Sequence, residues 1–256
     1  MKTYIVGNWK MNFTVGDASV YLHKLLKRIK PARNLQVAIA PSTIALQPLS
    51  LQIDRKKLKL AAQNCCGKDY GAYTGETAIS QLRGMVDYCI VGHSERRYVF
   101  NETDQQIREK VAACVRNNIT PILCIGETES ERTFGETRDV LRDQLSSGLK
   151  DVSREDLEKC IIAYEPVWAI SSVKGARPAT PDDIANSIKI IREFLREMYG
   201  KTIEEKMPVL FGGSVNPSNA GAYLTIPGVN GLLIGGASLI ADQFDDIIET
   251  AKKVAS

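Results

Sequence analysis

Eight short apolar runs alternate with amphipathic segments along the whole chain. Each run is apolar at consecutive positions, which is typical of parallel strands that are buried on both faces. No linker or change of composition divides the 256 residues. Eight strand–helix units in about 250 residues match a single (β/α)8 barrel in size and count. The sequence therefore predicts an α/β fold in which residues 1–256 form one barrel domain.

The predicted elements cover most of the chain. The runs that we interpret as strands are 4–7, 35–40, 58–63, 88–92, 121–126, 160–164, 208–211 and 231–234. The segments with helical character are 17–29, 43–51, 78–85, 103–117, 137–147, 182–198, a helix capped by Asn216-Pro217, and 242–254. A doubly wound sheet is the alternative, but its Gly-x-Gly-x-x-Gly signature does not follow the first predicted strand.

Composition and charge exclude several classes of protein. The net charge is only +3, and the densest basic runs, Lys24 to Lys30 and Arg55 to Lys59, are more typical of solvated faces than of a nucleic-acid patch. No apolar stretch approaches the roughly 18 residues that a membrane span requires. We therefore expect neither nucleic acid nor a membrane as a partner.

The six cysteines form no Cys-x-x-Cys pair, and no cluster of histidines accompanies them. Cys89, Cys124 and Cys160 lie inside apolar runs, where cysteine behaves as a small hydrophobic residue. This usage favours a reducing compartment over a disulfide scaffold or a metal site. The chain also starts directly with a strand-like run rather than a signal peptide. We therefore expect a cytoplasmic protein without a bound metal.

Four polar residues follow three of the predicted strands. Asn8 and Lys10 follow the first strand, His93 follows the fourth, and Glu165 follows the sixth, directly before Pro166. In a (β/α)8 barrel the active site lies at the carboxyl ends of the strands. One acid, one imidazole and one lysine are therefore predicted to converge on a pocket, although a surface glutamate at a strand end is the plainer interpretation of Glu165 alone.

The roles of His93 and Lys10 stay open at this level. Ser94 and its successors resemble the start of a short helix, whose positive end would keep the His93 ring neutral as an N–H donor. A structural histidine is the alternative. Lys10 could neutralise a bound phosphate, form a Schiff base if desolvated, or be an ordinary surface cation.

The last two predicted strands end in glycine, at Gly212-Gly213-Ser214 and Gly235-Gly236. Without side chains the backbone can approach an anion, and successive N–H groups can bind it. Tight turns without a ligand are the alternative. The segment after Glu165 is a long loop of small residues that ends at the helix start Thr180-Pro181. This order predicts a lid over a catalytic base.

With these residues in view, the chain closely resembles the triosephosphate isomerase family, whose fold is the TIM barrel. The matching segments are Gly7-Asn8-Trp9-Lys10-Met11-Asn12, Ala62-Gln63-Asn64, Gly71-Ala72-Tyr73-Thr74-Gly75-Glu76, Val91-Gly92-His93-Ser94-Glu95-Arg96-Arg97, Cys124-Ile125-Gly126-Glu127, Tyr164-Glu165-Pro166-Val167-Trp168-Ala169-Ile170, Gly212-Gly213-Ser214-Val215 and Gly235-Gly236-Ala237-Ser238-Leu239. They span the chain in the family's order.

The resemblance implies the interconversion of dihydroxyacetone phosphate and D-glyceraldehyde 3-phosphate through an enediolate, in glycolysis and gluconeogenesis. It implies that Glu165 is the base, that neutral His93 polarises the carbonyl, and that Lys10 supplies positive charge close to Glu95. Asn8 would orient the substrate. No metal and no organic cofactor is implied.

The resemblance also implies substrate-binding, lid and dimer residues. Backbone N–H groups that would hold the phosphate belong to Ser171, Ser214, Gly235 and Gly236. Lid residues would be Pro166, Val167, Trp168, Lys174, Gly175 and Ala176. The loop 64–76 with its Thr74 would enter a partner subunit, which implies a homodimer.

Two departures from the family concern the lid. The segment Ser171–Ala179 is longer than usual, with Val173 where the family has glycine, and Phe211 replaces a tyrosine whose hydroxyl holds the closed lid. We therefore expect an active enzyme that closes with changed contacts, for which Arg177 or Ser172 could supply a latch. A binding protein that has lost efficient catalysis and a Schiff-base aldolase are the competing hypotheses.

Overall fold

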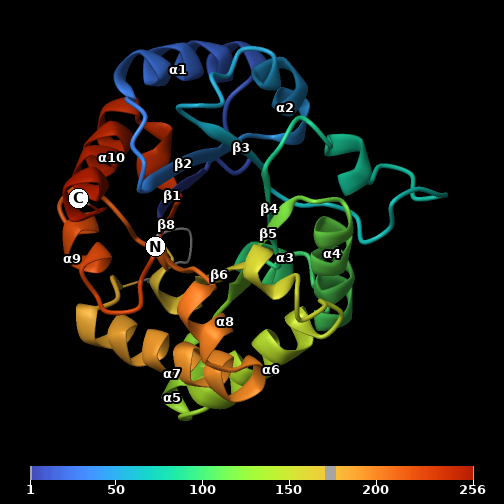
Figure 1. Ribbon diagram of the computed structural model, residues 1–256, viewed down its shortest axis with the longest axis vertical. Coiled ribbons are helices and arrows are strands. Elements are labelled where there is room, and N and C mark those ends of the chain that lie inside the picture. Colours follow the sequence, from blue (N-terminus) through green and yellow to red (C-terminus); the bar gives the residue numbers. More distant parts are fainter. Residues whose placement is uncertain (1, 171–176, 256) are drawn as a thin grey trace.

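Eight parallel strands close into a barrel in which every strand pairs with its neighbours in the chain and β1 pairs with β8. The computed structural model describes residues 2–170 and 177–255. Figure 1 shows the helices arranged around the strands, with α10 beside α1 where the ring closes. The predicted single (β/α)8 TIM barrel is therefore confirmed as the fold class.

The bounds of the elements are as follows. The strands are β1 Thr3–Asn8, β2 Leu35–Ala40, β3 Lys59–Ala62, β4 Tyr88–Val91, β5 Thr120–Ile125, β6 Ile161–Tyr164, β7 Val209–Gly213 and β8 Gly231–Ile234. The α-helices are α1 Val15–Arg28, α2 Thr43–Ser50, α3 Ser94–Tyr98, α4 Asp104–Arg116, α5 Glu129–Thr133, α6 Thr137–Leu149, α7 Pro181–Tyr199, α8 Lys201–Lys206, α9 Ala220–Leu224 and α10 Ala241–Ala255.

The strands are continuously apolar because their two faces fill two different cores. In β1, for example, Ile5 packs in the outer layer under the helices, whereas Val6 packs in the barrel interior. Small side chains such as Ala38 and Ala163 belong to the interior cluster, where opposite strands face one another across limited space. Both faces of each strand therefore contribute apolar burial, which stabilises the barrel by roughly 25 cal/mol per Å² of apolar surface removed from water.

Side-chain caps mark where three of the long helices, α1, α4 and α7, begin. Thr14 and Thr180 cap α1 and α7, and each forms a reciprocal capping box with an aspartate three residues later. Thr103 caps α4 in the same way with Gln106. Each such cap satisfies backbone N–H groups that the first turn leaves unpaired, and contributes about 1 kcal/mol.

Two predicted helices are wrong in extent. The segment 78–85 contains only the 3₁₀ turn Ile79–Leu82, because the chain turns away at Gly84, which has a φ of +77°. The helix expected at Asn216-Pro217 starts at Ala220 instead. The Asn216 Oδ1 accepts the N–H groups of Ser218 and Asn219, so this asparagine forms a turn ahead of the helix.

Two short helices were not predicted. They are α5 and α8, which follow β5 and α7. Gly200 has a φ of +89° and separates α7 from α8 in a stretch that reads as one helical pattern. Helices of one or two turns carry too little apolar periodicity to be recognised.

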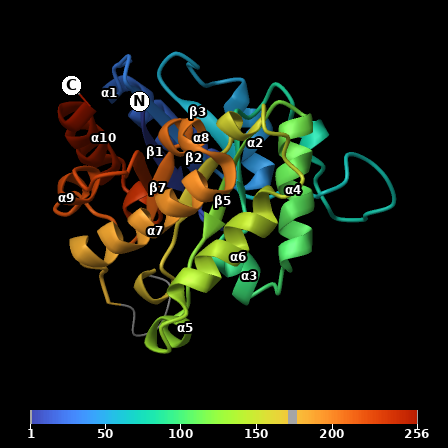
Figure 2. The same ribbon diagram turned by 60° about the horizontal axis from the view of Figure 1, so that its bottom comes forward.

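The loop 64–76 projects from the side of the barrel next to α4 (Figures 1 and 2). Its base is held to α4 by two ion pairs, between Lys68 and Glu109 at 2.9 Å and between Asp69 and Arg116 at 3.0 Å. Its projecting part exposes Tyr70, which is 89% accessible. No helix within residues 2–170 and 177–255 combines the length and the apolar character that crossing a bilayer requires.

Candidate active site

Glu165 directly follows β6 and is buried at the carboxyl end of the barrel, with only 3% of its surface accessible. Its backbone N–H donates to the Ile125 carbonyl oxygen at 2.8 Å, which continues the strand pairing by one residue. The carboxylate accepts the Ser94 N–H through Oε2 at 3.2 Å and lies 3.2 Å from His93 Nε2 through Oε1. Burial, and secondarily the Glu165 charge, raise the pKa of the neighbouring Cys124 thiol.

His93 is the N-cap residue of α3, and its ring is oriented by that helix. The Nδ1 atom accepts the Glu95 backbone N–H at 3.2 Å. A ring nitrogen that accepts a hydrogen bond carries no proton, so the proton of this imidazole lies on Nε2. The Nε2–H group therefore points toward Glu165, as a neutral donor at the centre of the site.

Lys10 lies beside His93 in an unusual backbone conformation, with a φ of +53°. Its N–H donates to the Asn8 Oδ1 at 3.1 Å, and its carbonyl oxygen accepts the Gln63 Nε2 at 2.8 Å. The Lys10 Nζ pairs with the Glu95 Oε1 at 2.5 Å. The left-handed backbone conformation costs a non-glycine residue roughly 1–2 kcal/mol. These contacts offset that cost and hold the ammonium at the mouth of the barrel.

Glycine is required where β7 ends. A Cβ atom on Gly212 would lie 2.9 Å from the Glu165 Cγ, so any side chain there would displace the buried carboxylate. After β8, a Cβ on Gly235 would meet the Lys10 Cε at 3.8 Å, and one on Gly236 would meet nothing within 4 Å. Gly235 therefore lies beside the Lys10 side chain, and Gly236 borders open space.

A cavity joins the predicted residues. Asn8, Lys10, His93, Glu165, Gly212 and Gly235 are among the residues that line a small space of about 20 Å³. Asn8, Lys10 and His93 also line a neighbouring cavity of about 310 Å³. An acid, a neutral imidazole and a cation thus meet at one opening, which is the arrangement expected of a proton-transfer site.

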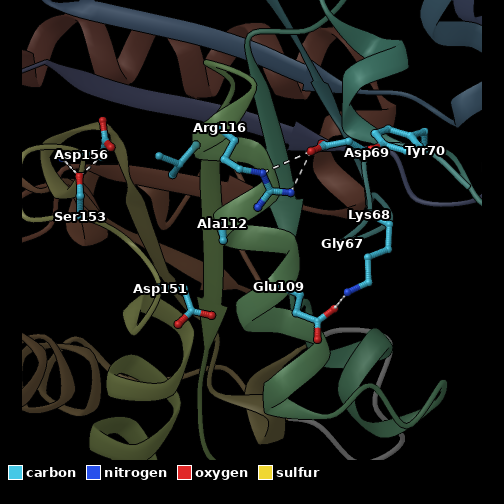
Figure 3. A pocket seen from close by; sticks show the side chains of 11 residues that line it. Gly67, Lys68, Asp69, Tyr70, Glu109, Ala112, Arg116, Asp151, Ser153 and Asp156 are labelled. Carbon is cyan, nitrogen blue, oxygen red and sulfur yellow. Dashed lines mark hydrogen bonds and ion pairs between the residues drawn. The ribbon is translucent and has the colours of Figure 1, made fainter.

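A larger cavity of about 680 Å³ lies elsewhere, between α4 and the base of the loop 64–76 (Figure 3). Four of its charged side chains pair with one another, Lys68 with Glu109 and Arg116 with Asp69, while Asp151 and Asp156 pair with Arg108 and Lys159. No unpaired acid or base converges on a point there among the described residues. We therefore place the candidate active site at the strand ends rather than in the larger cavity.

Glu127, after β5, supports the segment that follows Glu165. It is fully buried, and its Oε1 accepts the Trp168 Nε1 at 2.9 Å and the Tyr164 hydroxyl at 3.1 Å. Arg132 lies 3.4 Å from the same oxygen and its guanidinium stacks over the Trp168 ring at 4.6 Å. Burial raises the pKa of Glu127, against the opposing effect of these hydrogen bonds.

Arg177 and Tyr223 hold the other end of that segment. The Arg177 guanidinium also lies over the Trp168 ring, at 4.4 Å, and 3.6 Å from the Asp183 carboxylate. The Tyr223 hydroxyl donates to the Ala179 carbonyl oxygen at 3.1 Å. Phe211 packs edge-on against Tyr223, with ring centroids 4.9 Å apart. The Tyr223 hydroxyl therefore contacts this segment next to Phe211, whose ring has no hydroxyl group.

The described part of the chain brings together Asn8, Lys10, His93 and Glu165. The Ser214 Oγ donates to the Ala169 carbonyl oxygen at 2.9 Å, which ties β7 to the segment after Glu165. Pro166 precedes the 3₁₀ turn Val167–Ala169, in which Trp168 is buried. The predicted residues Ser171, Ser172, Val173, Lys174, Gly175 and Ala176 lie outside the described residues. Thr74 is exposed on the projecting loop.

Sequence reasoning assigned no role to Gln63 or to the Ser94 N–H group. Gln63 donates to both Lys10 and Ala40 carbonyl oxygens at 2.8 Å, and so joins three strand ends. Its only signal was its place at the end of the third predicted strand. A backbone donor such as that of Ser94 has no residue type and leaves no signal in a sequence.

Comparisons with known proteins agree with the geometry. A family model described as Triosephosphate isomerase matches residues 3–251. A triosephosphate isomerase of Chloroherpeton thalassium is 41% identical over 253 residues, which cover 98% of this chain and 99% of the relative. Another, from Clostridium perfringens, is 39% identical over 97% of this chain and 99% of the relative. A third, from Caldanaerobacter subterraneus, is 40% identical over 95% and 97%. The chain is therefore an isomerase that belongs to the triosephosphate isomerase family.

Proposed function

We propose that the protein interconverts dihydroxyacetone phosphate and D-glyceraldehyde 3-phosphate, in glycolysis and gluconeogenesis. One observation carries the proposal: a buried carboxylate, Glu165, lies 3.2 Å from the Nε2 of His93, whose Nδ1 is occupied by the Glu95 N–H. A base and a neutral hydrogen-bond donor at this separation can act on adjacent carbon and oxygen atoms of one small substrate.

In the proposed reaction Glu165 takes a proton from the carbon next to the carbonyl group. The substrate oxygen replaces the carboxylate as acceptor of the His93 Nε2–H, which stabilises the negative charge that develops on it. His93 then passes protons between the two enediolate oxygens, and the acid form of Glu165 returns its proton to the neighbouring carbon. No electrons leave the substrate, so the steps need no redox cofactor.

Lys10 and Asn8 are proposed to position the substrate. The Lys10 ammonium borders Gly235, so a phosphate that accepts the N–H groups of Gly235, Gly236 and Ser214 would lie close to a positive charge. Asn8 is 6% accessible and fixes the Lys10 backbone through its Oδ1. We also retain Ser171 as a phosphate donor and residues 166–168 and 174–176 as the lid that excludes water, as the family resemblance implies.

A Schiff-base aldolase is less well supported. The Lys10 Nζ lies 2.5 Å from a Glu95 carboxylate oxygen. An amine that is held as an ammonium ion by a carboxylate has no lone pair with which to attack a carbonyl. Borohydride reduction in the presence of substrate should therefore leave Lys10 unmodified, and a labelled Lys10 would favour the aldolase.

A coupled isomerase assay tests the proposal on the native chain, Glu165→Asp and His93→Gln. Native turnover is expected, with kcat lower by about 10²–10⁴-fold in each variant, because general acid–base catalysis contributes that much. Lys10→Met should instead raise KM, since it removes charge from the phosphate site. A native chain without turnover, whose phosphate-analogue binding is intact, would identify a binding protein and refute the proposed activity.

We further propose that residues 1–256 act as one catalytic domain and assemble as a homodimer through the loop 64–76. The exposed Tyr70 on the projecting loop and the 97% accessible Met11 supply apolar surface for a partner. The six cysteines are all free thiols, which is in keeping with a cytoplasmic location.

A further inference from the structure

Three cysteines from separate parts of the chain meet under helix α4. Cys65 follows β3, Cys89 lies in β4, and Cys114 lies in α4. All three belong to the outer core between the strands and the helices, and none is more than 2% accessible. The proposed catalytic steps use none of them. Their spacing in the sequence gives no hint of the cluster, because the barrel itself brings β3, β4 and α4 together.

The three sulfur atoms have the separations of a metal-binding set. All lie within 4.8 Å of one another, and the Cys65 and Cys114 Sγ atoms are 3.7 Å apart. For a metal–sulfur bond of about 2.3 Å, three sulfurs in a plane around one ion lie about 4.0 Å apart. An ion between them would therefore need sulfur movements of less than an ångström or so.

The ligand set selects the kind of ion. Among the described residues no histidine, carboxylate or fourth cysteine joins the group. Structural zinc sites are four-coordinate, whereas this group supplies three sulfur ligands. Thiolate sulfur is soft and favours Cu(I), an ion that is stable with three sulfur ligands.

We propose that Cys65, Cys89 and Cys114 form a three-sulfur site that binds one Cu(I) ion per chain. The ion enters from a cavity of about 370 Å³ that Cys66, Glu102 and Lys110 help to line. Cys66 is the chain neighbour of Cys65 and is half-buried, and Lys110 donates to the Asn64 Oδ1 at 2.9 Å. A local opening at Cys66 and Lys110 connects this cavity with the cysteine cluster.

The test titrates the reduced protein with Cu(I) under anaerobic conditions, with a chromophoric Cu(I) chelator as competitor. One ion per chain is expected, and X-ray absorption at the copper edge should show three sulfur neighbours. Cys65→Ser and Cys114→Ser should each weaken Cu(I) binding by more than about tenfold. Cys160→Ala, which changes an equally buried cysteine outside the cluster, should leave the affinity unchanged.

Two further arms keep the test decisive. Cys66→Ser removes the half-buried neighbour, and binding by that variant must match the native chain. If the cluster variants do not fold, the native absorption spectrum decides: oxygen or nitrogen neighbours, or two sulfurs only, overturn the proposal. Retained affinity in folded Cys65→Ser overturns it as well, as does tighter binding of Zn²⁺ than of Cu(I) by the native chain.

Discussion

At the scale of single residues, the site depends on groups that are held in one place by their neighbours. Gly212 leaves room for the Glu165 side chain, which a methyl group at that position would contact at 2.9 Å. Glu127 in turn is fully buried and holds Trp168 by accepting its indole N–H group. Neither residue touches the proposed reacting atoms, and both decide where those atoms lie.

Gly212→Ala should lower kcat by roughly tenfold to a hundredfold, because a displacement of about 1 Å at a catalytic base can cost that much. Thermal stability should change little, since the long Glu165 side chain can move aside. Steady-state kinetics and a melting curve measure both. Gly16→Ala is the matched control, because its Cβ would meet only the Thr14 Oγ1 at 3.8 Å. Equal activity of the two variants would contradict the proposed role of Gly212.

Glu127 should make stability depend on pH. Burial raises its pKa from the ordinary value of 4.5, so the folded chain holds this proton more tightly than the unfolded chain. Its contribution therefore favours folding at low pH and becomes unfavourable as pH rises through the folded pKa. Relative to the native chain, Glu127→Gln should gain in melting temperature between pH 4.5 and neutrality. A difference that is constant or that falls over this range would show that the carboxyl is not desolvated.

At the scale of elements, the segment between β6 and α7 is fixed at both of its described ends. Trp168 is stacked with Arg132 and Arg177, and both arginines pair with Asp183 at the start of α7. Tyr223 of α9 holds Ala179 on the other side. Arg177, where we expected a latch, therefore contacts Trp168 and Asp183. The lid itself, residues 166–168 and 174–176, stays a prediction.

Arg177→Ala should weaken the binding of a substrate analogue by severalfold, because a cation–π contact and an exposed ion pair together contribute about 1 kcal/mol. Phe211→Tyr restores the hydroxyl that the family uses, so it should recover part of that affinity in the double variant. Isothermal calorimetry and turnover measure both effects. If neither variant changes affinity or turnover, the changed-latch hypothesis fails.

Tyr223→Phe removes the hydroxyl that the Ala179 carbonyl oxygen accepts and leaves the ring packing intact. The loss of one buried hydrogen bond should destabilise the protein by about 1 kcal/mol. Analogue affinity should fall as well if this contact positions the segment. A melting curve reports the loss of stability separately from the loss of analogue affinity. An unchanged affinity with a lowered melting temperature would assign Tyr223 a structural role alone.

A feature of this protein could be predicted from the sequence only where it leaves a local signal there. The strands were predicted because both of their faces are apolar, and the long helices because their apolar periodicity marks them. The short helices α5 and α8 were missed, since one or two turns carry no periodic signal. Asn8, Lys10, His93 and Glu165 were named as candidates because they follow predicted strands, and the structure places them around one cavity. The cysteine cluster was missed because proximity between β3, β4 and α4 is a property of the closed barrel alone.

At the scale of the whole molecule, the loop 64–76 is the feature that a lone barrel does not explain. It projects beyond α4 and lies across the barrel from α10 (Figure 1). Two ion pairs to α4 hold its base in place, so it is presented as a fixed surface. A loop with exposed tyrosines in this position is suited to insertion into a second copy of the chain.

Thr74→Arg should therefore shift the proposed dimer toward monomers, because a large charged side chain on this loop would have to be desolvated in an interface. Sedimentation velocity measures the shift, and turnover at a fixed chain concentration should fall with it. Val254→Arg adds the same charge on α10, at a side chain that is 41% accessible, and should leave assembly unchanged. A native chain that sediments as a monomer would refute the dimer directly.

Pairing of β1 with β8 has a consequence for the behaviour of the protein in concentrated solution. Every described strand has a hydrogen-bonded neighbour on both sides, so the folded barrel offers no strand edge to which another chain could add. The same eight strands are continuously apolar, and any partly folded state in which β1 and β8 are apart exposes two such edges. The rate of aggregation should therefore rise with the population of partly folded states in which β1 and β8 are apart, rather than with that of the native state. Agents that promote closure of the barrel should increase solubility during refolding.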